Sequence, residues 1–332
     1  MEVLQIIWFI LIGVLLLGYS ILDGFDLGIG VLFPFLAKND NEKRVLLNAI
    51  APFWDGNEVW LLTGAGALFA AFSNVYATVF SGFYLALMIV LFSLILRAVS
   101  MEFRAQTDNK KLWERVFVIS SFLPSLLYGV ALGNIIVGVP LNAQMEFTGN
   151  FFTLLRPFPL SLGLLGLSAI LLQGSTYSAL KSEGELNNRA RELTKVISLI
   201  FIGLFLLALV LTFVCMPDAV SKPVAWIFGI ITIIFVWFTK LNAKNGDDFK
   251  SFIFASLSFA GLWSLAGSVM FPNMLKASNN STLSLTIWNA SSSKLTLTVM
   301  LIIALIGMPI VLAYTYMIYR WFRGKVVLED VE

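Results

Sequence analysis

The feature that most constrains the fold is a series of long apolar runs. A membrane-spanning helix needs about 20 predominantly apolar residues. The runs cover residues 6–36, 46–72, 76–97, 116–138, 155–180, 196–215, 223–240, 251–271 and 295–320. Hydrophobic residues make up 58% of the 332-residue chain and charged residues 13%, whereas soluble proteins have about 45–50% and about 25%. The sequence therefore predicts an all-α integral membrane protein of about nine transmembrane helices, organised as a single polytopic domain over residues 1–332.

Two residue types that build metal centres are almost missing. The chain has no histidine and a single cysteine, Cys215. Histidine is the commonest metal ligand and the usual proximal ligand of haem. We therefore expect this chain to bind no metal and no redox cofactor by itself. The net charge of +2 gives no reason to expect nucleic acid binding.

The basic residues indicate how the chain is oriented. If the apolar runs cross the membrane in turn, 18 of the 22 lysines and arginines fall on one side. The opposite side holds Arg156, Lys222, Lys276 and Lys294. Basic loops stay in the cytoplasm under the positive-inside rule. This pattern predicts an outside N-terminus and a cytoplasmic C-terminus. It counts Arg97 among the residues of a cytoplasmic loop.

Four carboxylates fall inside the first two apolar runs. Asp23 and Asp26 are three residues apart, and so are Asp55 and Glu58. Residues at this spacing share one face of a helix. An acidic group in the hydrocarbon region is costly and is a functional candidate by default. We therefore expect a proton path in the cytoplasmic half of the membrane. The alternatives are structural: Asp23 caps or bends its glycine-rich helix, and Glu58 pairs with a base of a partner subunit.

The same helix carries Gly24 and Gly28, four residues apart. This spacing of small residues favours the close approach of another membrane helix. It is not a dinucleotide-binding motif, because no strand precedes it.

Longer motifs carry a resemblance to a known family. Leu22-Asp23-Gly24-Phe25-Asp26-Leu27-Gly28 and Trp54-Asp55-Gly56-Asn57-Glu58-Val59-Trp60 are similar to the hallmark segments of cytochrome bd oxidase subunit II. The similarity continues in order along nearly the whole chain. Further matching segments are residues 81–84, 129–134, 148–152, 173–177, 284–290 and 293–297. The chain departs from some members at Phe53, where they have His, at Glu58, where they have Gln, and at Asn289, where they have Asp.

The resemblance implies a role in the bacterial cytoplasmic membrane. Subunit II of this family pairs with a larger subunit I of similar fold, which carries two b-type haems and one d-type haem. Together they oxidise quinol and reduce oxygen to water, drawing protons from the cytoplasm. The resemblance places the proton path at Asp55 and Asp26, and we expect Glu58 and Asp23 to belong to it because they are the other two intramembrane carboxylates. It also implies contacts with lipids or a quinone, and with a small accessory single-helix subunit in some members.

Two other functions remain open on the sequence alone. A proton- or cation-coupled transporter could use the same carboxylates, although such proteins favour matching broken helices in two halves. Here the intramembrane carboxylates cluster only in the first two runs. A purely structural scaffold would not need four intramembrane acids.

The predicted orientation can be tested by labelling. Single cysteines beside Lys43, Lys110, Arg189 and Lys244, in a chain whose Cys215 has been replaced, should be shielded from an impermeant maleimide added to intact cells, because these loops carry most of the basic residues. Labelling after membrane disruption is the control. Modification of the Lys110 position in intact cells would contradict the orientation.

Overall fold

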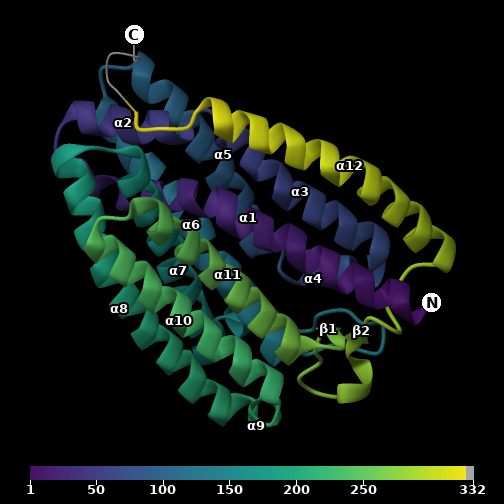
Figure 1. Cartoon of the computed structure of the whole chain (residues 1–332). Coiled ribbons are helices and arrows are strands. Elements are labelled where there is room, and N and C mark those ends of the chain that lie inside the picture. Colours follow the sequence, from purple (N-terminus) through teal and green to yellow (C-terminus); the bar gives the residue numbers. More distant parts are fainter. Residues whose placement is uncertain (327–332) are drawn as a thin grey trace.

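The computed structural model describes residues 1–326 as a bundle of long helices (Figure 1). The helices are α1 (Glu2–Leu36), α2 (Asp40–Ile50), α3 (Trp54–Ala71), α4 (Ser73–Gly82), α5 (Tyr84–Gln106), α6 (Lys110–Val137), α7 (Pro157–Lys181), α8 (Gly184–Cys215), α9 (Pro217–Val220), α10 (Pro223–Asn245), α11 (Asp248–Met270) and α12 (Lys294–Trp321). Two 3-10 turns, η1 (Phe151–Leu154) and η2 (Ser281–Leu283), and an antiparallel pair of short strands, β1 (Asn273–Leu275) and β2 (Leu285–Thr286), complete the described part.

Within the described residues, eight helices are long and apolar enough to cross a membrane: α1, α5, α6, α7, α8, α10, α11 and α12. Helix α3 packs along α1 as a further rod of 18 residues, about 27 Å long. Its first turns carry Asp55, Asn57 and Glu58, which lower its mean hydropathy. The expected number of about nine spans is therefore close to the structure.

Two of the expected boundaries are wrong. The run predicted at 46–72 is broken at residues 51–53 into α2 and α3, and Pro52 stands in the break. Proline lacks a backbone N–H and disfavours a continuous helix. The run predicted at 76–97 is divided at Phe83, and α5 then continues nine residues beyond Arg97, to Gln106.

One end of the bundle, called the basic end below, gathers the loops that carry most of the lysines and arginines. Arg104 of α5 pairs with Asp40 of α2 at 2.5 Å and with Glu114 of α6 at 3.0 Å. Arg189 of α8 pairs with Glu42 of α2. Partial burial of Asp40 opposes its ionisation, but hydrogen bonds from Arg104 and Lys110 outweigh this and hold the pKa of the Asp40 carboxyl below its usual value.

The segment that follows α12 lies against this basic end. The amide of Val326 donates to the carbonyl of Lys181 at 2.9 Å, and Lys181 Nζ donates to the carbonyl of Phe322 at 2.6 Å. The terminus itself, predicted to be cytoplasmic, falls in residues 327–332 and lies outside the described residues.

The opposite end is closed by a cap formed by residues 138–156 and 271–293, called the outer cap below because the predicted orientation places it outside. The cap is fastened to the helices by polar contacts. Gln5 donates to Ser291 at 2.7 Å, and Ser292 Oγ donates to the carbonyl of Ala70 in α3 at 2.6 Å. Arg156 donates to Asn134 at 3.0 Å. In Figure 1 the strands β1 and β2 lie at this end, far from α2.

Helix α7 is the centre of the bundle, and α12 is its least buried long helix. Most of α7 is buried, whereas Leu297 is the one buried residue of α12. Helices α7 and α1 approach each other closely. A Cβ added to Gly28 would lie 2.3 Å from the carbonyl oxygen of Ile170 and 2.8 Å from Cα of Gly174. The predicted close approach is therefore confirmed at Gly28, whereas a Cβ at Gly24 would meet only the Phe259 ring at 3.8 Å.

This crossing predicts unequal effects of two alanine substitutions in α1. Gly28→Ala places its methyl group against backbone atoms that cannot rotate away, and overpacking of this kind costs about 1–3 kcal/mol. The Tm of the purified protein should fall, as followed by size-exclusion chromatography after heating. Gly13→Ala is the matched control, because nothing lies within 4 Å of a Cβ at Gly13. Equal Tm values for the two variants would contradict this account of the crossing.

Candidate functional site

A buried arginine joins three helices near the basic end. Arg97 of α5 is fully buried, and its Nη2 lies 2.7 Å from Asp23 Oδ1 of α1 and 2.5 Å from Glu58 Oε1 of α3. The Asp23 side chain is also fully buried, whereas 24% of the Glu58 side chain is exposed. One guanidinium therefore holds one carboxylate from each of two other helices.

The assignment of Arg97 to a cytoplasmic loop is wrong. Arg97 lies inside α5, and residues 98–106 continue this helix beyond it toward the basic end. The sequence suggested that Glu58 pairs with a base of a partner subunit. In this structure the base that contacts Glu58 is Arg97 of the same chain. A sequence signal existed: an arginine that directly follows an apolar run is near enough to the membrane to pair with acids at the same depth.

Asp26 has a different environment from Asp23. It is fully buried, and its Oδ2 accepts a hydrogen bond of 2.8 Å from Asn57 Nδ2 of α3. Asn57 Oδ1 in turn accepts from Tyr319 of α12 at 3.3 Å. No ion pair to Asp26 is present in the described part of the chain. A chain of polar groups thus runs from α12 through α3 to a buried carboxyl.

Asp55 stands apart from this buried group. It lies in the first turn of α3, one turn before Glu58, and its side chain is exposed. The expected shared face of Asp55 and Glu58 agrees with their positions on one helix, but the structure brings only Glu58 to Arg97. Of the four predicted acids, Asp23, Asp26 and Glu58 gather around the α1–α3 contact, and Asp55 opens to the surface of the chain.

The buried group has unused hydrogen-bonding capacity. In residues 1–326, seven buried side-chain nitrogen or oxygen atoms lack a hydrogen-bond partner, and five of them belong to Asp23, Asp26 and Arg97. The contact between Arg97 and Asp23 is close but is not aligned as a hydrogen bond. Buried polar atoms almost always find partners in protein or water. Such a cluster can therefore accept water or an additional proton.

A surface hollow lies beside this polar chain. It has a volume of about 450 Å³ and is lined by Tyr316, Tyr319 and Arg320 of α12 and by Arg323 just after this helix. Phe53, which precedes α3, stacks on Tyr319 with ring centroids 4.4 Å apart. Sequence reasoning missed Asn57 and Tyr319, although Asn57 stands between the two acids of its own motif.

The residues present do not fit a haem site. The chain has no histidine. Cys215, the one thiol, is exposed at the end of α8, which is the outer-cap end of the bundle. Within the described residues, no group of three or more Cys, Asp or Glu side chains is arranged to hold a metal ion. The chemistry that these residues support is the binding and movement of protons.

Comparisons with known proteins agree with the motifs. The family model described as cytochrome bd terminal oxidase subunit II matches residues 4–322. The chain is 38% identical to cytochrome bd-I ubiquinol oxidase subunit 2 of Escherichia coli strain K12, over 100% of this chain and 97% of that protein. It is 34% identical to cytochrome bd ubiquinol oxidase subunit 2 of Bacillus subtilis strain 168, over 98% of each.

A solved structure shares the fold. A chain of the bd oxidase from Geobacillus thermodenitrificans superposes with a TM-score of 0.81 at 16% identity, covering 96% of this chain and 98% of that one. With the full-length family match and the sequence identities, the conclusion follows that this chain is a member of the cytochrome bd terminal oxidase subunit II family.

Proposed function

We propose that the chain is the haem-free subunit of a quinol oxidase in the bacterial cytoplasmic membrane, and that it supports a haem-bearing subunit I and carries protons to it. Full-length relatives whose names state this subunit support the first part. The lack of histidine supports the assignment of all three haems, two of b type and one of d type, to the partner. Quinol supplies the electrons, and the reduction of oxygen to water consumes the protons.

The observation that carries the proton role is the imbalance of charge around Arg97. Asp23 and Glu58 share one guanidinium, and Asp26 lies beside them on the Asn57 amide without a cation of its own. With all three carboxyls ionised the group would have a net charge of −2, and an uncompensated buried charge is strongly destabilising. A proton held on the group reduces this cost. Asp26 is the best position for it, because it is fully buried and has only the Asn57 amide as its partner.

The remaining residues have distinct proposed roles. Asp55, exposed at the start of α3, collects protons from the basic end. The hydroxyl of Tyr319 and the amide of Asn57 provide a second approach to Asp26 from the hollow beside α12. Arg97 holds Asp23 and Glu58 beside the proton path, and its single positive charge limits how many of the neighbouring carboxyls are ionised at once.

We place subunit I against the side of the chain formed by α3, α5 and α12. Asp55 is exposed on this side, and Glu58 is partly exposed there. Carboxylates that face lipid are costly, so a polar or hydrated partner surface must cover them. The side also presents large apolar residues, including Val59, Leu62 and Ile306. A partner here would receive the proton directly.

A proton-coupled transporter is the second candidate. The polar chain from Tyr319 to Asp26 would suit it equally well. The relatives do not support it, because those that match the full length of the chain are oxidase subunits. Copurification with a haem-bearing partner, together with oxygen uptake driven by quinol, distinguishes the two.

Replacing the titratable groups should slow turnover of the assembled oxidase. Asp26→Asn keeps the shape of the side chain but cannot carry a proton, and the loss of an acid–base relay costs about 10²–10⁴-fold when no other route exists. Asp55→Asn should also slow turnover, but less, because water reaches an exposed position. Glu58→Gln should be the mildest of the three. Oxygen consumption with excess quinol measures each effect.

The control for this series is Asp108→Asn, which removes an exposed acid from the loop between α5 and α6. Haem content and subunit stoichiometry must equal those of the wild type. If Asp26→Asn and Asp55→Asn both assemble fully and keep wild-type turnover at every pH tested, the proton path lies elsewhere.

The role of Arg97 gives a separate prediction about stability. Arg97→Met leaves Asp23 and Glu58 without their base, and breaking a buried ion pair in this way costs about 3–5 kcal/mol. The yield and Tm of the complex should fall. Asp23→Asn combined with Arg97→Met should recover part of the loss, because fewer unpaired charges remain. A double variant that is as unstable as the sum of the two single variants would rule out the pairing as the cause.

A further inference from the structure

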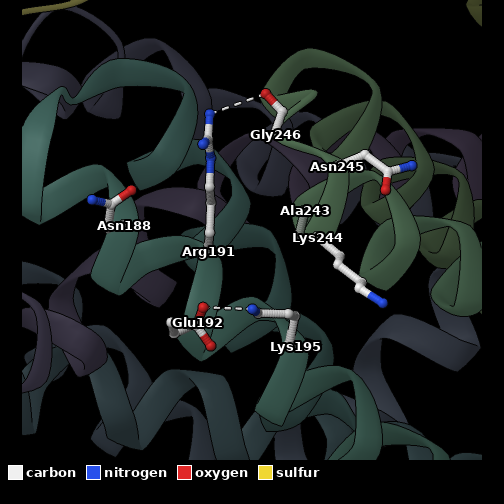
Figure 2. A pocket seen from close by; sticks show the side chains of 8 residues that line it. All are labelled: Asn188, Arg191, Glu192, Lys195, Ala243, Lys244, Asn245 and Gly246. Atoms are coloured by element: carbon white, nitrogen blue, oxygen red, sulfur yellow. Dashed lines mark hydrogen bonds and ion pairs between the residues drawn. The ribbon is translucent and has the colours of Figure 1, made fainter.

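A second polar site lies at the basic end, on the side of the bundle away from α12. A pocket with a volume of about 320 Å³ lies between the start of α8 and the end of α10, and Figure 2 shows the side chains that line it. It is lined by Asn188, Arg191, Glu192, Lys195, Ala243, Lys244, Asn245 and Gly246. In Figure 1, α8 and α10 lie on the opposite side from α3 and α12. The pocket is therefore separate from the buried carboxylates and from the side proposed for subunit I.

The pocket is held in shape by one arginine. Arg191 Nε and Nη2 donate to the two carboxylate oxygens of Asp248 at 2.7 and 2.8 Å, and Nη2 also donates to the carbonyl of Gly246 at 3.0 Å. Asn187 donates to the same carboxylate at 2.9 Å. Gly246 ends α10 in the left-handed conformation, with φ of 81°. These contacts join α8, α10 and α11, so the pocket is a built feature rather than a gap between mobile side chains.

The charges in the pocket leave one cation without a partner. Asp248 compensates Arg191, and Glu192 pairs with Lys195 at 2.5 Å. Lys244 is exposed and makes no ion pair or side-chain hydrogen bond in the described part of the chain. The pocket therefore offers a net charge of about +1, the complement of a single phosphodiester anion. Amide groups of Asn188 and Asn245 add neutral hydrogen-bonding groups beside it.

The same helices continue into the membrane as apolar surfaces. Leu199 is one turn below Lys195 on α8 and is 53% exposed. Trp237 is two turns below Lys244 on α10 and is 48% exposed, with Lys240 Nζ 5.1 Å from the centre of its ring. Tryptophan and lysine at this level mark the boundary between headgroups and acyl chains. A molecule with an anionic head and two apolar tails matches both the polar pocket and the apolar surfaces of α8 and α10 below it.

We propose that this pocket binds the phosphate of one anionic phospholipid, of the phosphatidylglycerol type, with its acyl chains on the exposed faces of α8 and α10. Lys244 provides the charge that selects an anionic over a zwitterionic headgroup. Lys195 and Arg191 position the phosphate, and Lys244 and Lys195 lay their alkyl chains along the membrane boundary. Basic pockets between membrane helices are known to bind anionic headgroups in this way.

The test uses the complete oxidase complex in nanodiscs that contain phosphatidylglycerol and phosphatidylethanolamine in equal amounts. Native mass spectrometry counts the lipids of each type that remain bound. The wild type should retain one phosphatidylglycerol that the variants lose. Each lysine near a membrane surface contributes about fivefold to anionic lipid binding. Preference for phosphatidylglycerol should therefore fall about fivefold in Lys244→Gln and about 25-fold in Lys195→Gln/Lys244→Gln.

The matched control is Lys38→Gln/Lys111→Gln, which removes the same charge from two exposed lysines outside the pocket. Turnover should be unchanged in all of these variants, which shows that the complexes are intact. An equal loss of phosphatidylglycerol in the control, or equal retention of the two lipids by the wild type, would overturn the proposal. Inorganic phosphate is the third arm: if it displaces the bound lipid at an equal concentration, the pocket is a site for free phosphate and the proposal fails.

Discussion

The guanidinium of Arg97 makes it possible for carboxylates to be buried among the helices of this molecule. It lies inside the membrane region and touches Asp23 of α1 and Glu58 of α3. Without this cation, two carboxylates would be buried alone, at a cost that few membrane helices tolerate. With it, they can be present while Asp26 stays outside the ion pair, on the amide of Asn57. Under the proposed function, structural support and proton handling are thus divided between neighbouring acids of one helix.

Helix α1 combines two kinds of surface because of this division. Its half toward the outer cap is largely apolar and only partly buried, whereas residues 23–33 are buried without interruption. Close contact at Gly28 and Gly174 brings α7 against that buried half. The tight packing excludes lipid and holds the acids at a fixed depth. It also explains why a helix with two aspartates is stable in this position.

The membrane class and most of the spans were predictable from the sequence, because long apolar runs have few alternative structures. The breaks at Pro52 and Phe83 were not, since hydropathy alone does not distinguish one long helix from two shorter ones. The acids of the candidate site were found because they stand out against an apolar background. Arg97 was missed because it lies at the end of its run, and Tyr319 because a tyrosine near a helix end usually serves as an interfacial anchor. The contact of Arg97 with Asp23 and that of Tyr319 with Asn57, which only the structure reveals, identify both residues as parts of the site.

The position of α12 in the chain has a consequence for biogenesis. This helix contributes a single buried residue to the bundle and is fastened mainly near its two ends, at Leu297 and through Phe322. It also follows α1 to α11 in the order of the chain. The hydroxyl of Tyr319 therefore reaches Asn57 only after α1 to α11 have been synthesised. In a nascent chain the polar chain that leads to Asp26 consequently lacks its Tyr319 hydroxyl until α12 has been made, which couples completion of the polar chain to insertion of this helix.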